Sequence, residues 1–311
     1  MLKIRAMLGF LCIALIASCA TIDNSTSPQP APQTPVIQED LGQEVARHLT
    51  SRYADVRTNC GTDSQPAFLC SGVMIRGTSS NPTYHVWNNS PNSIAKGGVS
   101  FSYLRADSTF NKLAYGYTNG FVFNAYVYAD TSLHPEIFCF FPIDAGTSIR
   151  SDKGCGEVPG YAGSGPCHLQ NVITAAQFWT HYNAHSSNRH YYQCGFDVTD
   201  NRNSLAGPAF AAGVGAMKLM GAESFNEQNE VIVDAWKDNL GKTLPLEAFF
   251  YLYGSDGKTV AQRNQQDLWT TDGVLIPIIS IRLSRSAGEA TTFRYLPEDQ
   301  TETMPPVSPN K

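Results

Sequence analysis

Six cysteines in the body of this chain constrain its fold more than any other feature. They are Cys60, Cys70, Cys139, Cys155, Cys167 and Cys194. In a protein exported to an oxidising compartment, an even number of cysteines predicts a disulfide framework, here with three bonds. Six cysteines allow fifteen pairings. The short spacings favour Cys60–Cys70 and Cys155–Cys167, which leaves Cys139–Cys194.

The N-terminus indicates such an export. Lys3 and Arg5 precede an apolar run over residues 7–17. This is the layout of a secretory signal, and the run is too short to span a bilayer. The run leads through Ile-Ala-Ser to Cys19, a sequence that resembles a bacterial lipobox. The resemblance implies cleavage before Cys19 and a lipid on its thiol; cleavage nearby, with Cys19 free, is the alternative.

The organisation of the rest of the chain follows from proline content and length. Four prolines lie between residues 28 and 35, which disfavours helix and favours an extended tether. We expect a lipoprotein signal peptide over residues 1–18, a Pro/Ser-rich tether over 19–39, an α+β catalytic domain over 40–297 and a disordered tail over 298–311. The expected location is outside the cytoplasm, on the outer membrane or cell surface, with release as a further possibility.

Periodicity predicts an α+β domain whose first half is rich in strands. Apolar residues at helical spacing predict helices over residues 39–53, 174–185, 205–220 and 257–270. A capping box over residues 224–227 predicts another helix that reaches residue 240. Runs of β-branched and aromatic residues predict strands over residues 67–78, 83–87, 98–104, 112–117, 120–129, 136–143, 246–254 and 274–283.

Three of these segments carry a pattern typical of an enzyme site. Arg76 ends one expected strand, Ser100 and Ser102 alternate on the next, and Glu230 follows Gln228 in a Gln-x-Glu sequence. This order resembles the R-S-E pattern of ADP-ribosyltransferases. The resemblance implies an ADP-ribosyltransferase-like fold. It also implies a site in which Arg76, Ser102 and Glu230 are catalytic, and Gly77, Thr78, Ser100, Gln228 and His85 bind the cofactor.

The chemistry explains these residue types. Nicotinamide in NAD is already a cationic leaving group, so the barrier is the oxocarbenium-like ribose, which a carboxylate stabilises. An arginine binds pyrophosphate in a bidentate manner, a serine hydroxyl orients its neighbours, and a glycine such as Gly77 lets nicotinamide approach the backbone. An aromatic side chain such as His85 can stack on nicotinamide or adenine; alternatively, His85 and Trp87 face a second layer.

Each element of the pattern also has a purely structural interpretation. Alternating serines are typical of a polar sheet face. Acids in the first turn of a capped helix are favoured by the helix dipole alone. Glu227 and Glu247 are rival candidates for the catalytic acid. A predicted helix at Glu230 also conflicts with the family pattern, in which the Gln-x-Glu sequence lies at a strand.

A longer resemblance covers most of the body. The runs RYADVRTNCGTDSQPAFLCSGVMIRGT, YHVWNNSPNS, GGVSFSYLRAD, CFFPIDA, QCGFDV, ESFNEQNE and LEAFFYLYG resemble the halovibrin family. This resemblance implies an exported enzyme that cleaves the nicotinamide–ribose bond of NAD, as an NAD glycohydrolase or a mono-ADP-ribosyltransferase. NAD is then the substrate, no metal is needed, and the acceptor is water, a protein or a small guanidino compound. The lipobox departs from a freely secreted form and implies membrane attachment through Cys19.

Composition and motifs also bear on other classes of function. After residue 18, 20 bases face 27 acids, which argues against a nucleic-acid partner. Phosphate-binding loops, nucleophile elbows, HExxH sequences and Cys-x-x-Cys pairs are absent from the sequence. A non-catalytic surface-binding or adhesion lipoprotein remains the main alternative. A metal-dependent hydrolase is a third, built on four histidines: His168, His181, His185 and His190.

Overall fold

The computed structural model describes residues 39–88, 90–91, 93, 98–123, 136–146, 149–151, 154–199, 203–234, 245–302 and 304. The expected signal peptide, Cys19 and nearly all of the expected tether lie outside these residues, as do residues 124–129 of one expected strand. Within the described part of the chain, no helix has both the length and the apolar character that crossing a membrane requires.

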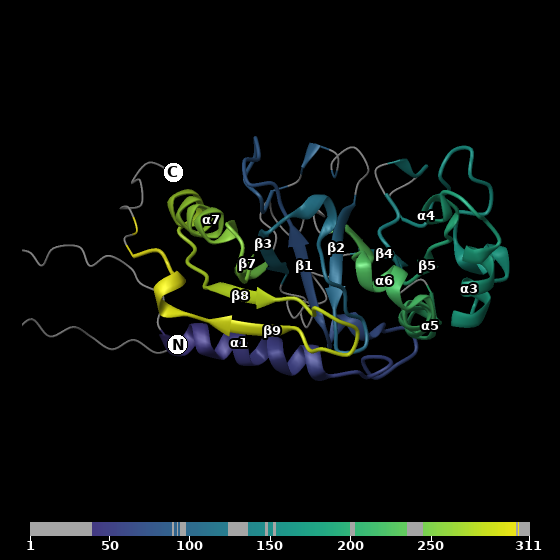
Figure 1. The fold of residues 1–311 in the computed structure, drawn as a ribbon, viewed down its shortest axis with the longest axis horizontal. Helices are drawn as coiled ribbons and strands as arrows, with labels where there is room; N and C mark the ends of the chain where they lie inside the picture. Colours follow the sequence, from purple (N-terminus) through teal and green to yellow (C-terminus); the bar gives the residue numbers. More distant parts are fainter. Residues whose placement is uncertain are drawn as a thin grey trace, which may run out of the picture. The chain divides into compact units, whose positions relative to one another are not determined.

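The fold is mixed α+β, as predicted, and its centre is a sheet of nine strands among the described residues (Figure 1). The strands are β1 Val73–Gly77, β2 Val99–Leu104, β3 Asn119–Phe123, β4 Glu136–Phe141, β5 Phe196–Asp197, β6 Glu230–Asp234, β7 Leu246–Leu252, β8 Ile278–Arg282 and β9 Thr292–Tyr295. Their order is β5-β4-β6-β2-β1-β3-β7-β8-β9. Neighbours run antiparallel except β7 and β8, which are parallel and joined through a helix.

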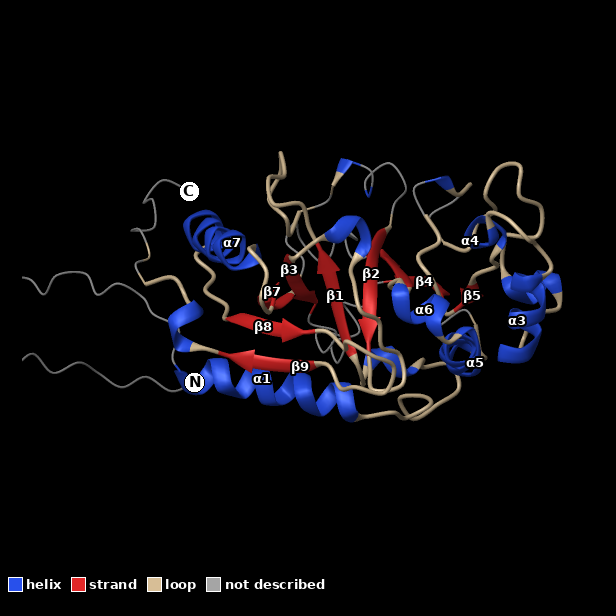
Figure 2. Cartoon of the chain, in the orientation of Figure 1, coloured by secondary structure: helices blue, strands red, loops and turns tan. Residues whose placement is uncertain are grey.

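Helices cover both faces of the sheet (Figure 2). They are α1 Glu39–Ala54, α3 Ala175–Asn183, α4 Arg189–Tyr192, α5 Ala206–Met220, α6 Ala222–Asn226 and α7 Gly257–Asp272. Strand residues alternate between two apolar cores. Phe249 joins a core shared with α3, α5 and α7, and its neighbour Phe250 joins the core under α1.

All six cysteines form disulfides, but two of the three expected pairings are wrong. Cys60–Cys70 is confirmed, whereas the other bonds are Cys139–Cys155 and Cys167–Cys194 instead of Cys155–Cys167 and Cys139–Cys194. The reason is tertiary. The backbone N–H of Cys167 donates to the carbonyl of Gly195 at 2.8 Å, which places Cys167 beside Cys194. Sequence spacing carries no signal of that contact.

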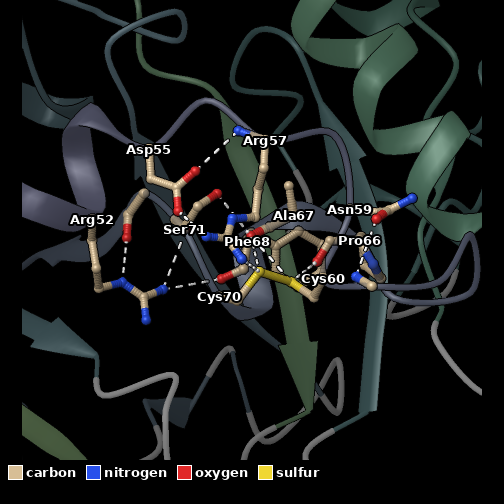
Figure 3. The surroundings of a disulfide bond; sticks show 12 residues. Arg52, Asp55, Arg57, Asn59, Cys60, Pro66, Ala67, Phe68, Cys70 and Ser71 are labelled. Atoms are coloured by element: carbon tan, nitrogen blue, oxygen red, sulfur yellow. Dashed lines mark hydrogen bonds and ion pairs between the residues drawn. A yellow bond between two sulfur atoms is a disulfide. The ribbon is translucent and has the colours of Figure 1, made fainter.

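The Cys60–Cys70 bond belongs to a fixed connection between α1 and β1 (Figure 3). Buried Arg52, from α1, donates hydrogen bonds to the carbonyls of Gly72 at 2.6 Å and of Phe68 and Ser71 at 3.3 Å. Carbonyls at the end of a short helical turn need such donors when they are buried. One guanidinium therefore fixes where β1 begins.

Three expected elements are wrong, and two strands begin later than expected. One of these is the strand expected over residues 274–283, which is β8 and begins at Ile278. The helix predicted from residue 224 to 240 is only α6, which ends at Asn226, and β6 begins at Glu230. Residues 83–87 form turns, not a strand, and residues 112–117 contain a short 3-10 turn, Ala114–Gly116. The strand expected over residues 67–78 begins with a 3-10 turn, and only residues 73–77 are extended.

The packed body also extends beyond the expected start of the tail at residue 298. Tyr251 donates a short hydrogen bond to buried Asp299. The amide side chain of Gln300 bonds both the N–H and the carbonyl of Ile278, at 2.9 and 3.0 Å. Polar residues in this segment are structural partners of the sheet, which their tail-like composition does not reveal.

We predict that the disulfide closing the longest loop stabilises the fold more than the one closing the shortest loop. The Cys167–Cys194 bond spans 27 residues and Cys60–Cys70 spans 10. From chain entropy, the double variant Cys167→Ala/Cys194→Ala should lose about 3–4 kcal/mol of unfolding free energy. The double variant Cys60→Ala/Cys70→Ala should lose about 2–3 kcal/mol. Urea unfolding of the two double variants measures both values. A greater loss for the Cys60–Cys70 pair would contradict the prediction.

Candidate functional site

Three adjacent strands bring the R-S-E residues together. β2 lies between β1 and β6 in the sheet. Ser102 pairs with Ile75 of β1, and Phe101 pairs with Val231 of β6. Because alternate residues of a strand share a face, Ser100 and Ser102 lie on one side of β2, and Glu230 follows on the adjacent strand.

The side chains make direct contacts. The hydroxyl of Ser100 donates to Oε1 of Glu230 at 2.6 Å, and Nη1 of Arg76 donates to the carbonyl of Ser100 at 2.9 Å. Burial lowers the pKa of Arg76, while the nearby Tyr84, Tyr117 and Glu230 oppose that shift. An arginine remains charged in any such setting, so a cation and a carboxylate flank Ser100.

Glu230 is held from two sides. Its side chain is buried, and besides Ser100 it accepts a hydrogen bond from the backbone N–H of Ala145 at 3.0 Å. Ala145 packs in a small core with Cys139 and Cys155, so the Cys139–Cys155 loop supplies this donor. Hydrogen bonds to the charged form of a buried carboxylate offset its loss of hydration.

Asn229 fixes the position of Glu230 in the sheet. The Oδ1 of Asn229 accepts from the N–H of Tyr103 at 2.7 Å, and its Nδ2 donates to the carbonyl of Tyr103 at 2.8 Å. The Nδ2 also donates to Ser108. Asn229 thus continues the β2–β6 pairing with a side chain in place of a backbone, and Gln228 and Glu230 are set on either side of it.

Gln228 connects the same segment to two loops. Its Oε1 accepts from the N–H of Ala114 at 2.9 Å, and its own carbonyl accepts from the N–H of Asp144 at 2.8 Å. These bonds hold the Tyr115 turn and the Asp144 loop against the start of β6. Tyr115 has the left-handed backbone (φ 56°) and is 87% exposed, so its ring stands in solvent beside the site.

Arg76, Ser100, Gln228 and Glu230 line one cavity of about 390 Å³. Seven of the eight residues expected at the site are in its wall: Arg76, Gly77, Thr78, Ser100, Ser102, Gln228 and Glu230. Tyr84, Tyr115, Tyr117 and Asp144 complete its polar and aromatic lining. The volume is in the range of small-molecule sites.

Two of these seven residues have evident structural roles. Gly77 leaves room for Tyr117, because a Cβ at Gly77 would lie 3.0 Å from the Cβ of Tyr117. The hydroxyl of Thr78 accepts from Nδ2 of Asn119 at 3.0 Å. Gly77 and Thr78 therefore contribute to the shape of the cavity.

His85, the eighth residue, does not line this cavity. It is exposed and stacks on buried Trp87 with 4.8 Å between ring centroids. Both belong to the wall of a neighbouring cavity. Trp87 packs into the core together with Val86, because the segment turns here and does not alternate as a strand would.

The rival acids lie elsewhere. Oε1 of Glu247, on β7, lies 2.5 Å from Nδ1 of His48, on α1. Glu227 is exposed and lines an adjacent groove. Of the three candidate glutamates, Glu230 alone lines the cavity.

Three of the four histidines considered as metal ligands, His181, His185 and His190, have other side-chain contacts. Nε2 of His181 lies 3.1 Å from the carbonyl of Tyr192, and His185 stacks on the ring of Tyr192 at 3.6 Å. Among the described residues, no group of three or more His, Cys, Asp or Glu side chains is arranged to hold a metal.

Sequence reasoning missed the residues that complete the site. Tyr115, Tyr117 and Asp144 line the cavity, and Ala145 donates to Glu230. The strand expected over residues 112–117 includes the sequence Tyr115-Gly116-Tyr117, although glycine between aromatics is compatible with the turn that is present. Ala145 acts only through its backbone, for which a sequence holds no signal.

The arrangement can bind a ligand that carries both anionic groups and a developing positive charge. A buried carboxylate and a guanidinium line one cavity, and three tyrosine rings offer apolar faces. Compared with models of known families and with curated proteins, the sequence matches none. The function must therefore be argued from the site itself.

We predict that Asn229 is essential to this geometry. Asn229→Ala leaves the buried N–H and carbonyl of Tyr103 without their side-chain partner, at a cost of about 1–3 kcal/mol for each group. The free energy of unfolding should fall by about 2–4 kcal/mol. Asn226→Ala removes an exposed amide whose Oδ1 accepts from Nδ2 of Asn111, and should change the free energy of unfolding by less than about 0.5 kcal/mol. Equal effects of both variants in urea unfolding would refute the role of Asn229.

Proposed function

We propose that this protein cleaves the nicotinamide–ribose bond of NAD, with Glu230 as the residue that stabilises the reacting ribose. The observation that carries this proposal is the contact between Glu230 and Ser100, at 2.6 Å, in a cavity that Arg76 also lines. A buried carboxylate next to an arginine suits a substrate with a cationic reacting centre and an anionic pyrophosphate.

The reaction needs few proton transfers. The bond between ribose C1′ and the pyridinium nitrogen breaks, its electron pair goes to the ring, and nicotinamide leaves neutral. Positive charge develops on C1′ and the ring oxygen of ribose, where the Glu230 carboxylate stabilises it. Water then bonds to C1′ and loses its proton to solvent, which makes the protein an NAD glycohydrolase.

Arg76 and the serines position the substrate. The Arg76 guanidinium is planar and suits bidentate bonds to pyrophosphate oxygens. Its bond to the Ser100 carbonyl limits its rotation, so it remains ready for the anion. The Ser100 hydroxyl keeps Glu230 oriented, and Ser102 lies next along the same face of β2.

Tyrosine rings suit the leaving group. Tyr115 and Tyr117 lie in the cavity lining with 5.6 Å between their ring centroids. The positively charged pyridinium of NAD is attracted to the face of an aromatic ring, by about 0.5–2 kcal/mol. Because Tyr115 is so exposed, it can meet the nicotinamide at the cavity entrance.

The placement of the R-S-E residues supports an ADP-ribosyltransferase-like reaction centre. Glu230 begins β6, so the Gln-x-Glu sequence lies at a strand, as the family pattern requires. Transfer to a protein or to a small guanidino acceptor differs from hydrolysis only in the nucleophile that reaches C1′. Three disulfides in one body support function outside the cytoplasm, with attachment to the membrane through Cys19 as part of the proposal.

The test is release of free nicotinamide from NAD by the purified, oxidised protein. We expect turnover without any acceptor. Glu230→Gln keeps the size of the side chain but removes the charge, and should lower kcat/KM at least about 100-fold. Glu227→Gln, the same change on an exposed residue nearby, should leave kcat/KM within about twofold.

Two results would contradict the proposal. One is equal activity of Glu230→Gln and the wild type. The other is intact NAD after incubation with the wild-type protein, both alone and with a small guanidino compound such as agmatine or with a cell lysate. The second result would favour the non-catalytic surface-binding lipoprotein.

A further inference from the structure

A second cavity adjoins the proposed active site. It has a volume of about 440 Å³ and lies between the segment of residues 81–87 and helix α7. Thr83 and Tyr84 line both cavities, so this segment separates them. None of the residues given catalytic roles above lines the second cavity.

The wall of this cavity holds two buried N–H donors that have no hydrogen-bond partner in the described part of the chain. They are Nε1 of Trp87 and Nδ2 of Asn264, on side chains 1% and 3% exposed. An unsatisfied buried donor costs about 1–3 kcal/mol, and such groups are rare enough to need an explanation. A ligand with hydrogen-bond acceptors in this cavity would provide one.

Other features of the cavity point to a flat, aromatic ligand. His85 is exposed and stacks on buried Trp87 with 20° between the ring planes, which holds the His85 ring as a flat surface at the cavity wall. Asp267 on α7 adds a carboxylate acceptor. A purine base presents ring nitrogens as acceptors for N–H donors, and adenine adds an exocyclic amine that can donate to a carboxylate.

The order of groups along the two cavities matches the order of groups in NAD. Glu230, proposed to act on the nicotinamide ribose, contacts Ser100, and Ser100 contacts Arg76. The Arg76 guanidinium, proposed to bind pyrophosphate, lies close to Tyr84. Beyond Tyr84 is the second cavity. The adenosine end of NAD also comes after its pyrophosphate.

We infer that the second cavity is the adenine subsite, with Trp87 and Asn264 as donors to ring nitrogens, Asp267 as acceptor from the amine and His85 as a stacking surface. This inference rests on the proposed function, since it assigns the remote half of the same substrate. It predicts that the enzyme prefers NAD to nicotinamide mononucleotide, which lacks the adenine.

The test compares two substrates that share the scissile bond. Nicotinamide mononucleotide lacks the adenylate half of NAD. Asp267→Asn should lower kcat/KM for NAD about tenfold and leave kcat/KM for the mononucleotide within twofold. Asp272→Asn, an exposed change on the same helix and outside the cavity, should alter neither. Equal activity of the wild type on both substrates, or an equal loss with both in Asp267→Asn, would overturn the inference while the proposed function stands.

A binding measurement keeps the inference testable if neither substrate is cleaved. Isothermal titration of the wild-type protein with AMP should show binding, and ribose 5-phosphate, which lacks the base, should show none. Asp267→Asn and Asn264→Leu should each weaken AMP binding about tenfold, with thermal unfolding confirming that both variants fold. No heat of binding with AMP, or equal binding of ribose 5-phosphate, would overturn the subsite.

Discussion

The pairing of β6 with β2, and of β2 with β1, is the constraint on which the site depends. Residues 76, 100 and 230 are far apart in the chain, and only this strand order places them within hydrogen-bond reach. Asn229 secures the order where backbone pairing gives way to side chains, because its amide bonds both polar groups of Tyr103. A shift of one residue in this register would turn Glu230 away from Ser100.

The disulfides support the site as well as the fold. Cys139–Cys155 lies in the small core that holds Ala145, whose N–H contacts Glu230. At the other end of the sheet segment, Arg52 and the Cys60–Cys70 loop fix the start of β1 and therefore the position of Arg76. The cavity is thus formed by strand ends held in place from outside, while the loops around it carry the tyrosines that line it.

Local pattern predicted much of this architecture, and failures arose where tertiary contacts override it. The helices over residues 39–54 and 257–272 and the strands around Phe101 and Phe249 carry strong periodicity and are correct. The capping box expected at Ser224 does not form, because Ser224 lies inside α6 and its hydroxyl donates to the carbonyl of Met217. A strand follows because β2 and β4 pair with Val231 and Val233. Residue types and order were enough to select seven residues of one cavity. The place of Tyr115 in the cavity, the hydrogen bond from the Ala145 N–H and the observed cysteine pairs depend on contacts between distant segments. Local sequence pattern does not predict such contacts.

A crystal structure of the Glu230→Gln protein grown with NAD would test the central claim most directly. Our account predicts the nicotinamide ribose against residue 230, the pyrophosphate against Arg76 and the nicotinamide near Tyr115, with the base beyond Tyr84. NAD bound outside this cavity, or an empty cavity at an NAD concentration far above the measured KM of the wild type, would contradict it.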